Sequence, residues 1–322
     1  MQKTQTFTCT TPQRLDTYMS SVLNETRNQV ISLIKEGCVE VDGKKMAKAG
    51  LKLKENQKII INFPEAKETP ALEIDFDVPI LYEDDDILVI NKPSGLTVHP
   101  APSVKEPTLV DWLKHKGIRL STISGEERHG IVHRLDKGTS GVMVVAKNNE
   151  AHVKLSEQLQ DKSMGRYYLA LNYLPLKNDI IVEGAINRSP NNRLKMSVRP
   201  EGKEAQTAFK KLLLSNDEKE ELLACKLFTG RTHQIRVHLE HIGRGILGDH
   251  LYGFKSKEGK IERIFLHAYI LYLVHPSSGE RVEFIAPLDN VMLEYINANY
   301  SKDLFNEQIS PSHFERHFTD LS

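Results

Sequence analysis

Apolar positions in residues 11–62 follow helical spacing first and strand spacing later. From Pro12 to Leu23 the apolar residues recur as on one face of a helix, and a second helical pattern begins at Arg27 and ends at Gly37, a residue typical of a helix C-cap. Residues 39–44 predict a strand leading into an Asp-Gly turn, and 59–61 predict a closing strand. So small a core favours a binding module over a catalytic one.

The rest of the chain divides into a linker, a larger domain and a tail. Residues 63–79 combine prolines with acidic residues and predict a linker. We expect a large domain over 80–300. Residues 301–322 are polar and poor in aliphatic side chains, which predicts a loosely ordered C-terminal tail.

Within residues 80–300 the pattern alternates between buried strands and amphipathic helices. The apolar run 87–90 predicts a strand, and we expect Asp84 to Asp86 to form the turn before it rather than a metal site. A short helix is expected over 108–116, with Trp112 as a core anchor. A second helix is expected to begin with Asn149 as its N-cap.

Several further runs have strand character. In the run 166–171, strict alternation places Tyr168 and Ala170 on one face and Tyr167 on the other, so one tyrosine is structural and the other is free to face a cleft. Pro, Asn and Gly turns separate the remaining runs, which indicates antiparallel pairing. These runs are 180–186, 205–214, 222–228, 264–274 and 281–286. The predicted fold class is α+β, a mainly antiparallel mixed sheet flanked by helices.

Composition indicates a protein of a reducing compartment. Three cysteines at positions 9, 38 and 225 fit no paired or metal-ligand spacing. No signal peptide and no apolar run of about 20 residues is present, so we expect a cytoplasmic protein without membrane contact.

Charge is distributed unevenly along the chain although its sum is zero. Residues 1–62 hold ten Lys/Arg and six Asp/Glu, whereas 63–90 hold one Lys and nine acids. A basic head before an acidic connector indicates separate units with separate partners.

The segment 130–141 contains the strongest candidate for chemistry. Asp136 lies between Arg134 and Lys137, and glycines follow at 138 and 141, where a chain can turn with positive φ. The apolar run 142–146 predicts a buried strand, so we expect Asp136 on a tight loop that leads into the core. The alternative is an aspartate that only caps its own turn, and the flanking cations weigh against it.

A second basic motif occupies residues 229–239. Thr232 is a candidate N-cap, after which residues 235, 239 and 242 share one helical face. Arg231 and Arg236 are then near the helix N-terminus, where a cation opposes the helix dipole at a cost of about 0.3–1 kcal/mol. This placement favours a nearby anion, either a protein carboxylate or a ligand phosphate. His233 and His238 lack a carboxylate at metal-ligand spacing, so neither a zinc set nor a hydrolase triad is indicated.

The N-terminal module resembles the αL RNA-binding domain of ribosomal small-subunit proteins. The resemblance rests on Arg-Leu-Asp at 14–16, a basic residue opening the second helix, and the Gly-x-Val-x-Val-x-Gly-Lys pattern at 37–44. This sequence has Thr-Arg-Asn where that family usually has Ser-Arg-Ser at the second helix. The RNA-contacting residues expected from it are Arg14, Arg27, Lys44 and Lys45.

The two motifs of the large domain together resemble the RluA-type pseudouridine synthases. His-Arg-Leu-Asp at 133–136 is followed by Gly-Thr-Ser-Gly at 138–141, and Thr-Gly-Arg-Thr-His-Gln-Ile-Arg occupies 229–236. Further matching segments are 86–95, 168–170, 248–253 and 266–268. The resemblance covers about residues 80–290 and implies an enzyme that isomerises uridine in RNA to pseudouridine without a metal or cofactor.

The same resemblance implies roles for individual residues. Asp136 is the expected catalytic residue at the ribose side of the glycosidic bond, with Arg236 as its salt-bridge partner, Tyr168 against the base and Arg134 assisting nucleotide extrusion. Flipping a nucleotide costs a few kcal/mol, and an aromatic ring replaces stacking worth roughly 1–3 kcal/mol. Direct attack on C1′ and a glycal route both stay open. Further substrate contacts are expected from His133, Lys92, Arg231 and Leu266.

The expected partner is RNA, most directly bacterial large-subunit (23S) ribosomal RNA, and the expected state is a monomer. Transfer RNA as substrate and a non-catalytic ribosome-assembly factor are the alternatives. A metal-dependent or carboxylate-nucleophile phosphatase would need acidic metal ligands or a phosphate-binding glycine loop, and the sequence shows neither.

Overall fold

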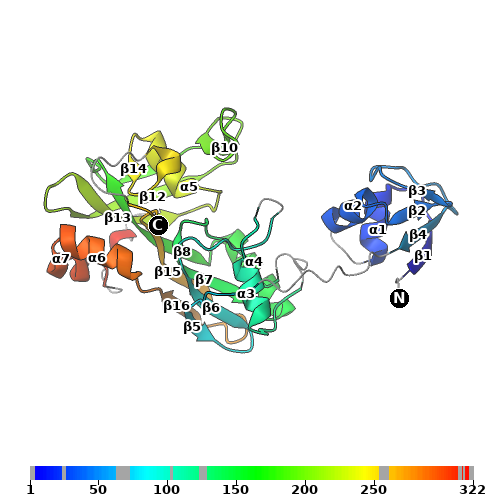
Figure 1. The fold of residues 1–322 in the computed structure, drawn as a ribbon, viewed down its shortest axis with the longest axis horizontal. Helices are drawn as coiled ribbons and strands as arrows, with labels where there is room; N and C mark the ends of the chain where they lie inside the picture. The colour runs from blue at the N-terminus through cyan, green and yellow to red at the C-terminus, as the bar shows by residue number, and fades with distance from the viewer. Residues whose placement is uncertain are drawn as a thin grey trace. The chain divides into compact units, whose positions relative to one another are not determined.

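The computed structural model describes residues 4–23, 27–62, 73–101, 104–122, 129–253, 261–310, 314 and 316–318, except for the side chains of 28, 29 and 32. The chain separates into two compact units, Met1–Leu72 and Glu73–Ser322 (Figure 1). Residues 63–72 of the expected linker lie outside the described residues. Ile74, Phe76 and Val78, which the same prediction places in the linker, pack against the core of the large unit and belong to it.

The small unit packs two helices against a four-stranded sheet of order β1-β4-β2-β3. Its core is formed by residues such as Met19, Ile34 and Ile59, all of them fully buried. Asp42 and Gly43 both have positive φ, 51° and 77°, as the expected two-residue hairpin turn requires. The elements are β1 (Thr4–Thr8), α1 (Leu15–Leu23), α2 (Arg27–Lys35), β2 (Val39–Val41), β3 (Lys44–Lys45) and β4 (Lys58–Asn62).

The large unit is built on a ten-stranded sheet whose central path is β5-β6-β7-β15-β8-β13-β12-β9, with β14 on β8 and β16 on β15. Among the described strands every pairing in this sheet is antiparallel except that of β7 with β15, which confirms the mainly antiparallel mixed sheet. Its strands are β5 (Ile80–Glu83), β6 (Ile87–Lys92), β7 (Ser140–Ala146), β8 (Gly165–Tyr173), β9 (Ile180–Glu183), β12 (Gln206–Leu214), β13 (Glu220–Leu227), β14 (Gly245–Ile246), β15 (Leu266–Val274) and β16 (Arg281–Ile285).

Helices cover both faces of this sheet, with α3 and α4 on one side and α6 and α7 on the other (Figure 1). The alternation predicted for β8 is confirmed, because Tyr168 and Ala170 join one core while Tyr167 and Leu169 join the other. Trp112 is buried as expected. The remaining elements are α3 (Leu109–His115), α4 (Asn149–Asp161), α5 (Gln234–His241), α6 (Asn290–Asn299), α7 (Lys302–Gln308), the 3-10 helix η2 (His250–Tyr252) and a separate hairpin of β10 (Ile186–Arg188) and β11 (Met196–Val198).

Two helix starts differ from their predictions. The N-cap of α4 is Asn148, whose side chain accepts a hydrogen bond from the backbone of Ala151, so Asn149 is already the first helical residue. The N-cap of α5 is His233 in a left-handed conformation with φ of 58°, without a side-chain cap. Thr232 is therefore not the cap, and Arg231 lies in the loop before the helix.

The prediction of a loosely ordered tail over 301–322 is wrong for its described residues. Phe305, Phe314 and Phe318 are buried in the same core as Tyr167. The Phe318 ring stacks on that of Tyr167 with centroids 5.0 Å apart. The prediction rests on polar character and low aliphatic content, although a buried aromatic ring removes more apolar surface from water than most aliphatic side chains.

No described helix combines the length and the apolar character needed to cross a lipid bilayer.

Candidate active site

Asp136 lies on a tight loop that leads directly into β7, as the sequence predicts. The loop is closed by a 3.1 Å hydrogen bond from the Thr139 amide to the Asp136 carbonyl. Gly141 has φ of +118°, and a Cβ there would lie 2.2 Å from the Ala268 carbonyl oxygen, so only glycine allows β7 to approach β15 here. Gly138, also expected to turn with positive φ, does not do so. Its missing side chain instead makes room for Ile264.

The carboxylate of Asp136 contacts a guanidinium from the other basic motif. Arg236, in the first turn of α5, donates from Nη1 to Asp136 Oδ2 at 3.1 Å. Arg236 is 5% exposed, whereas the Asp136 side chain is 20% exposed and can meet a ligand. The anion expected near this helix N-terminus is therefore a carboxylate of the protein itself, and the predicted pair is formed.

Asp249 completes the environment of Arg236. It accepts from Nε at 2.6 Å and from Nη2 at 3.0 Å, and it is 1% exposed. The Tyr252 ring lies against the same guanidinium, with its centroid 4.8 Å from Cζ. Burial lowers the pKa of Arg236, but the hydrogen bonds and charges of the two carboxylates outweigh it and leave the pKa raised. Arg236 is thus charged and fixed in orientation.

His233 is the second basic group near Asp136, with Nε2 3.8 Å from Oδ2. The Tyr252 hydroxyl accepts from the Met196 amide at 2.8 Å and lies 2.8 Å from His233 Nδ1. A phenol oxygen can donate its proton to Nδ1 or accept a second hydrogen bond from it. The negative charge of Asp136 near Nε2 favours the neutral tautomer that carries its proton on Nε2, and in that tautomer Tyr252 donates to Nδ1. Burial lowers the pKa of His233, although the Asp136 charge opposes this effect.

A small cavity of about 60 Å³ lies directly at Asp136, and it is lined among others by Tyr168, Leu266 and Arg236. Tyr168 is nearly buried on β8, and burial raises the pKa of its hydroxyl, which keeps the ring neutral. A larger cavity of about 1200 Å³ also reaches Asp136 and Arg236. The structure therefore gathers Asp136, Tyr168, Leu266 and Arg236 around one opening, as expected from the sequence.

Lys92 and His133, predicted to contact substrate, are instead buried. Lys92 is 0% exposed, and its ammonium donates to the backbone carbonyls of Pro93 and Leu96 at 2.9 and 2.8 Å. His133 Nε2 accepts from the Val144 amide at 3.1 Å, and its Nδ1 faces the guanidinium of Arg166. The structure corrects the predicted role of Lys92, whose ammonium is held by backbone carbonyls. His133 also lines a cavity beside the site, so its contact with substrate stays a prediction.

Arg134 and Arg231 are exposed at the rim, where ligands have access. Arg134 donates to the hydroxyl of Thr232, and Arg231 donates from Nε to the Glu204 carbonyl at 3.0 Å. The two motifs thus contact each other through an arginine and a threonine 98 positions apart. The roles predicted for both arginines are not tested by this geometry.

In the small unit, Arg14 and Arg27 both bind one buried carboxylate, Asp16. Their side chains remain 50% and 55% exposed, so each arginine also presents a charged edge to solvent. Lys44 and Lys45 are exposed on β3. Their expected contact with RNA stays a prediction.

Three residues of the site, Asp249, Tyr252 and Arg166, have no individual role in the sequence analysis. The segment 248–253 resembles a family signature, but its aspartate contacts Arg236 only through the tertiary fold.

One cluster of possible metal ligands is present in the described part of the chain. Asp84, Asp86 and His275 place ligand atoms within 4.8 Å of one another, the one such group of His, Cys and acidic residues there. Asp84 Oδ1 accepts from the amides of Asp86 and Ile87, which confirms the turn predicted before β6.

Comparison with known proteins identifies the family of the chain. Residues 86–241 match the model of the RNA pseudouridylate synthase family, and residues 13–59 match the S4 domain. A relative from Helicobacter pylori (strain J99), described as an uncharacterized RNA pseudouridine synthase, is 47% identical over 302 residues, covering 92% of each chain. The ribosomal large subunit pseudouridine synthase D of Nitrosomonas europaea is 38% identical over 297 residues, covering 88% of this chain and 84% of the relative.

A solved structure of similar fold is that of human RNA pseudouridylate synthase domain containing 1. It has a TM-score of 0.57 and 23% identity, and it covers 74% of this chain and 99% of its own. The chain belongs to the RNA pseudouridine synthase family and carries an N-terminal S4 domain. It is an isomerase that converts uridine in RNA to pseudouridine.

Proposed function

We propose that this enzyme isomerises uridines of large-subunit ribosomal RNA and that Asp136 breaks the glycosidic bond of a flipped-out nucleotide. The relatives named ribosomal large subunit pseudouridine synthase D support the substrate. An rRNA substrate would place the enzyme in the cytoplasm. The observation that carries the mechanism is the ion pair of 3.1 Å between the partly exposed Asp136 and the buried Arg236.

The chemistry needs an ionised carboxylate at the ribose. Isomerisation breaks the bond between C1′ and N1 and forms one between C1′ and C5, while C5 loses a proton and N1 gains one, so atoms and charge balance. Asp136 either attacks C1′ directly or removes a ribose proton to give a glycal. In both routes the guanidinium of Arg236 places a compensating positive charge beside the carboxylate when the RNA excludes water.

The flipped uracil needs a surface that replaces the lost stacking. Tyr168 and Leu266 line the small cavity beside Asp136 and supply an aromatic and an aliphatic wall. Arg134 at the rim is exposed and can occupy the space that the nucleotide leaves. The S4 domain supplies a second RNA contact through Arg14, Arg27, Lys44 and Lys45.

Pseudouridine mapping of ribosomal and transfer RNA tests this proposal. Cells lacking the protein are rescued with the wild type, with Asp136→Asn, or with Asp111→Asn, a control in the first turn of α3. We expect specific 23S sites to disappear and to return with the wild type and the control only. Loss of sites in transfer RNA alone would show that transfer RNA is the substrate. Rescue by Asp136→Asn would show that Asp136 is not a catalytic residue.

Purified protein separates binding from turnover. Asp136→Asn is expected to abolish tritium release from RNA labelled at uridine C5, while RNA affinity changes less than about threefold, because the substitution keeps the side-chain shape. Equal loss of binding and turnover would indicate a structural aspartate.

A further inference from the structure

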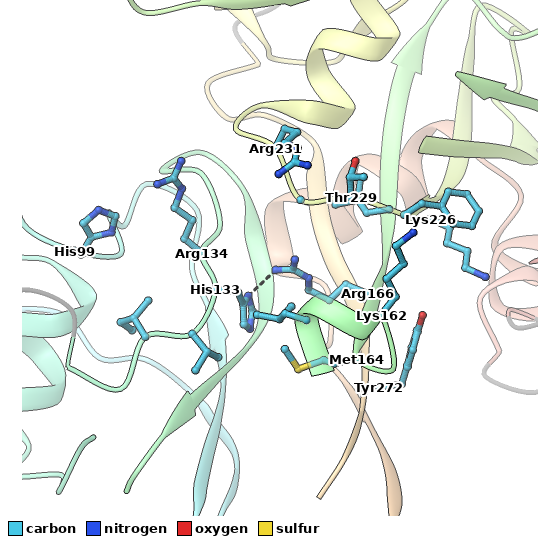
Figure 2. A pocket seen from close by; sticks show the side chains of 17 residues that line it. His99, His133, Arg134, Lys162, Met164, Arg166, Lys226, Thr229, Arg231 and Tyr272 are labelled. Carbon is cyan, nitrogen blue, oxygen red and sulfur yellow. Dashed lines mark hydrogen bonds between the residues drawn. The ribbon is translucent and has the colours of Figure 1, made fainter. Parts of the chain in front are cut away.

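A cavity of about 580 Å³ adjoins the Asp136 site and has no role in the proposed chemistry. It opens between the end of α4, the start of β8 and the loop that carries Arg134 (Figure 2). Its size suits a nucleotide-sized ligand. Gly165 forms part of its wall, and a Cβ there would lie 2.2 Å from the Tyr272 hydroxyl, so the glycine lets that ring lie close against β8.

The charged residues lining this cavity are all cationic. Five of the described residues around it are lysine or arginine, and none of those around it is aspartate or glutamate. The five come from different parts of the fold and surround the same space (Figure 2). They are Arg134, Lys162, Arg166, Lys226 and Arg231. Cations gathered in this way repel one another unless an anion joins them, which indicates an anionic ligand.

Lys226 carries its charge at a half-buried position. Its ammonium lies 5.8 Å from the centroid of the Tyr167 ring and 5.3 Å from that of Phe228, and it is half-buried at the end of β13. Burial lowers the pKa of Lys226, so holding a charge there carries a cost. Lys162 contributes from the C-cap of α4, where its backbone is left-handed with φ of 67°.

The cavity borders the small cavity at Asp136. The residues that line both are Arg134, Arg166, Leu227, Gly230 and Arg231. A Cβ added at Gly230 would have Arg166 Nη2 as its nearest neighbour, at 3.8 Å, so the wall shared by the two spaces is uncrowded. A polymer with one unit at Asp136 therefore has a charged path for the next unit.

We infer that this cavity binds a backbone phosphate of the RNA strand that carries the target uridine. Its proposed contacts are Lys162 and Lys226, which line this cavity but not the small one at Asp136. The inference rests on the proposed function, since it places an adjacent nucleotide of the same substrate. The two lysines act through binding and do not touch the reacting atoms.

Kinetics on an RNA stem-loop test the inference. We expect Lys162→Gln combined with Lys226→Gln to raise KM about tenfold, as loss of one charge-assisted contact would, while kcat changes less than about twofold. The slope of log affinity against log salt should fall by about 0.7–0.9 per lost phosphate contact. The control is Lys114→Gln, an exposed lysine on α3 outside the cavity lining, which should leave KM and the slope unchanged.

Single methylphosphonate substitutions identify the phosphate. Neutralising one phosphate beside the target uridine should weaken binding to the wild type about tenfold and binding to the double variant by less than about twofold. If every substitution weakens both proteins equally, or if the double variant keeps the wild-type KM and salt slope, the cavity does not bind a phosphate. These results contradict phosphate binding in the cavity only when the wild type is active. A wild type that forms no pseudouridine in any RNA would instead contradict the proposed function.

Discussion

Asp249 holds the guanidinium of Arg236 side-on, with hydrogen bonds of 2.6 Å to Nε and 3.0 Å to Nη2. These bonds leave Nη1 to donate to Asp136 Oδ2, at a distance of 3.1 Å. One arginine thus joins a fully buried carboxylate to a partly exposed one, and only the exposed one can meet RNA. We expect Asp249 to be a positioning residue whose effect on the reaction passes through Arg236.

Asp249→Asn is expected to lower kcat about 100-fold with little change in RNA affinity. The amide keeps the size of the side chain but supplies one acceptor oxygen in place of two, so the guanidinium can turn away from its side-on position. A displacement of about 1 Å at a catalytic group can cost this much. Single-turnover tritium release measures it. Asp303→Asn, at an exposed position of α7, is the matched control. Equal rates for the two variants would show that Asp249 does not position Arg236 for the reaction.

Tyr252→Phe tests the tautomer of His233. Removing the hydroxyl leaves the Met196 amide and His233 Nδ1 without the partner they share. The tautomer with its proton on Nε2, facing Asp136, then loses the donor that supports it. We expect kcat to fall about tenfold, the equivalent of about 1.4 kcal/mol, with KM unchanged. Tyr82→Phe, which removes a hydroxyl bound to Asp84 near the surface, should have no effect on kcat. A wild-type kcat in Tyr252→Phe would contradict the assigned tautomer.

Lys92 should make the stability of the large unit depend on pH. Burial lowers the pKa of Lys92 to about 7, whereas an unfolded lysine has a pKa of about 10.4. Between these values the unfolded chain binds more protons than the folded chain, so this residue makes stability rise with pH. The free energy of unfolding of the wild type minus that of Lys92→Met should therefore increase as the pH is raised above the folded pKa. A difference that is constant or falls over this range would mean that Lys92 stays charged.

The sequence is sufficient for features that depend on local periodicity. The alternation along β8 separates Tyr168 from Tyr167, and the spacing of Ile235 and Leu239 places one face of α5 in the core. The position of Asp136 before the apolar run of β7 follows from the same kind of argument. Each of these rests on residues within a few positions of one another, where geometry is determined by the helix or strand period.

Features that depend on tertiary contacts are missed or misjudged from the sequence. Asp249 is an ordinary loop aspartate until folding brings it to Arg236. Lys92 is predicted as a ligand contact from the family resemblance of the segment 86–95, yet backbone carbonyls of its own loop satisfy its ammonium. The polar residues of the tail predict loose order, although Phe314 and Phe318 decide its packing.

Two arginines of the S4 domain share the buried carboxylate of Asp16, which accepts hydrogen bonds from Arg14 at 3.0 and 2.9 Å and from Arg27 at 2.9 and 2.7 Å. The two guanidinium groups, Arg14 first, hold the pKa of Asp16 well below its usual range, against the opposing effect of burial. Because the folded pKa is depressed, this stabilisation is present above the unfolded value of about 3.9 and is lost as the pH falls below it toward the folded value.

Asp16→Asn should therefore destabilise the S4 domain at neutral pH and remove this part of its acid sensitivity. We expect a loss of about 1–2 kcal/mol, since both arginines are half-exposed and water screens their charges. Hydrogen exchange of the amides of β2 and β4, measured in the full chain, reports on this unit separately from the large one. Glu55→Gln, an exposed acid of the same unit, is the control. A clamp that stabilises the domain must slow its opening. If the amides of Asp16→Asn exchange as slowly as those of the control at neutral pH, the ion pairs of Asp16 with the two arginines contribute nothing to folding.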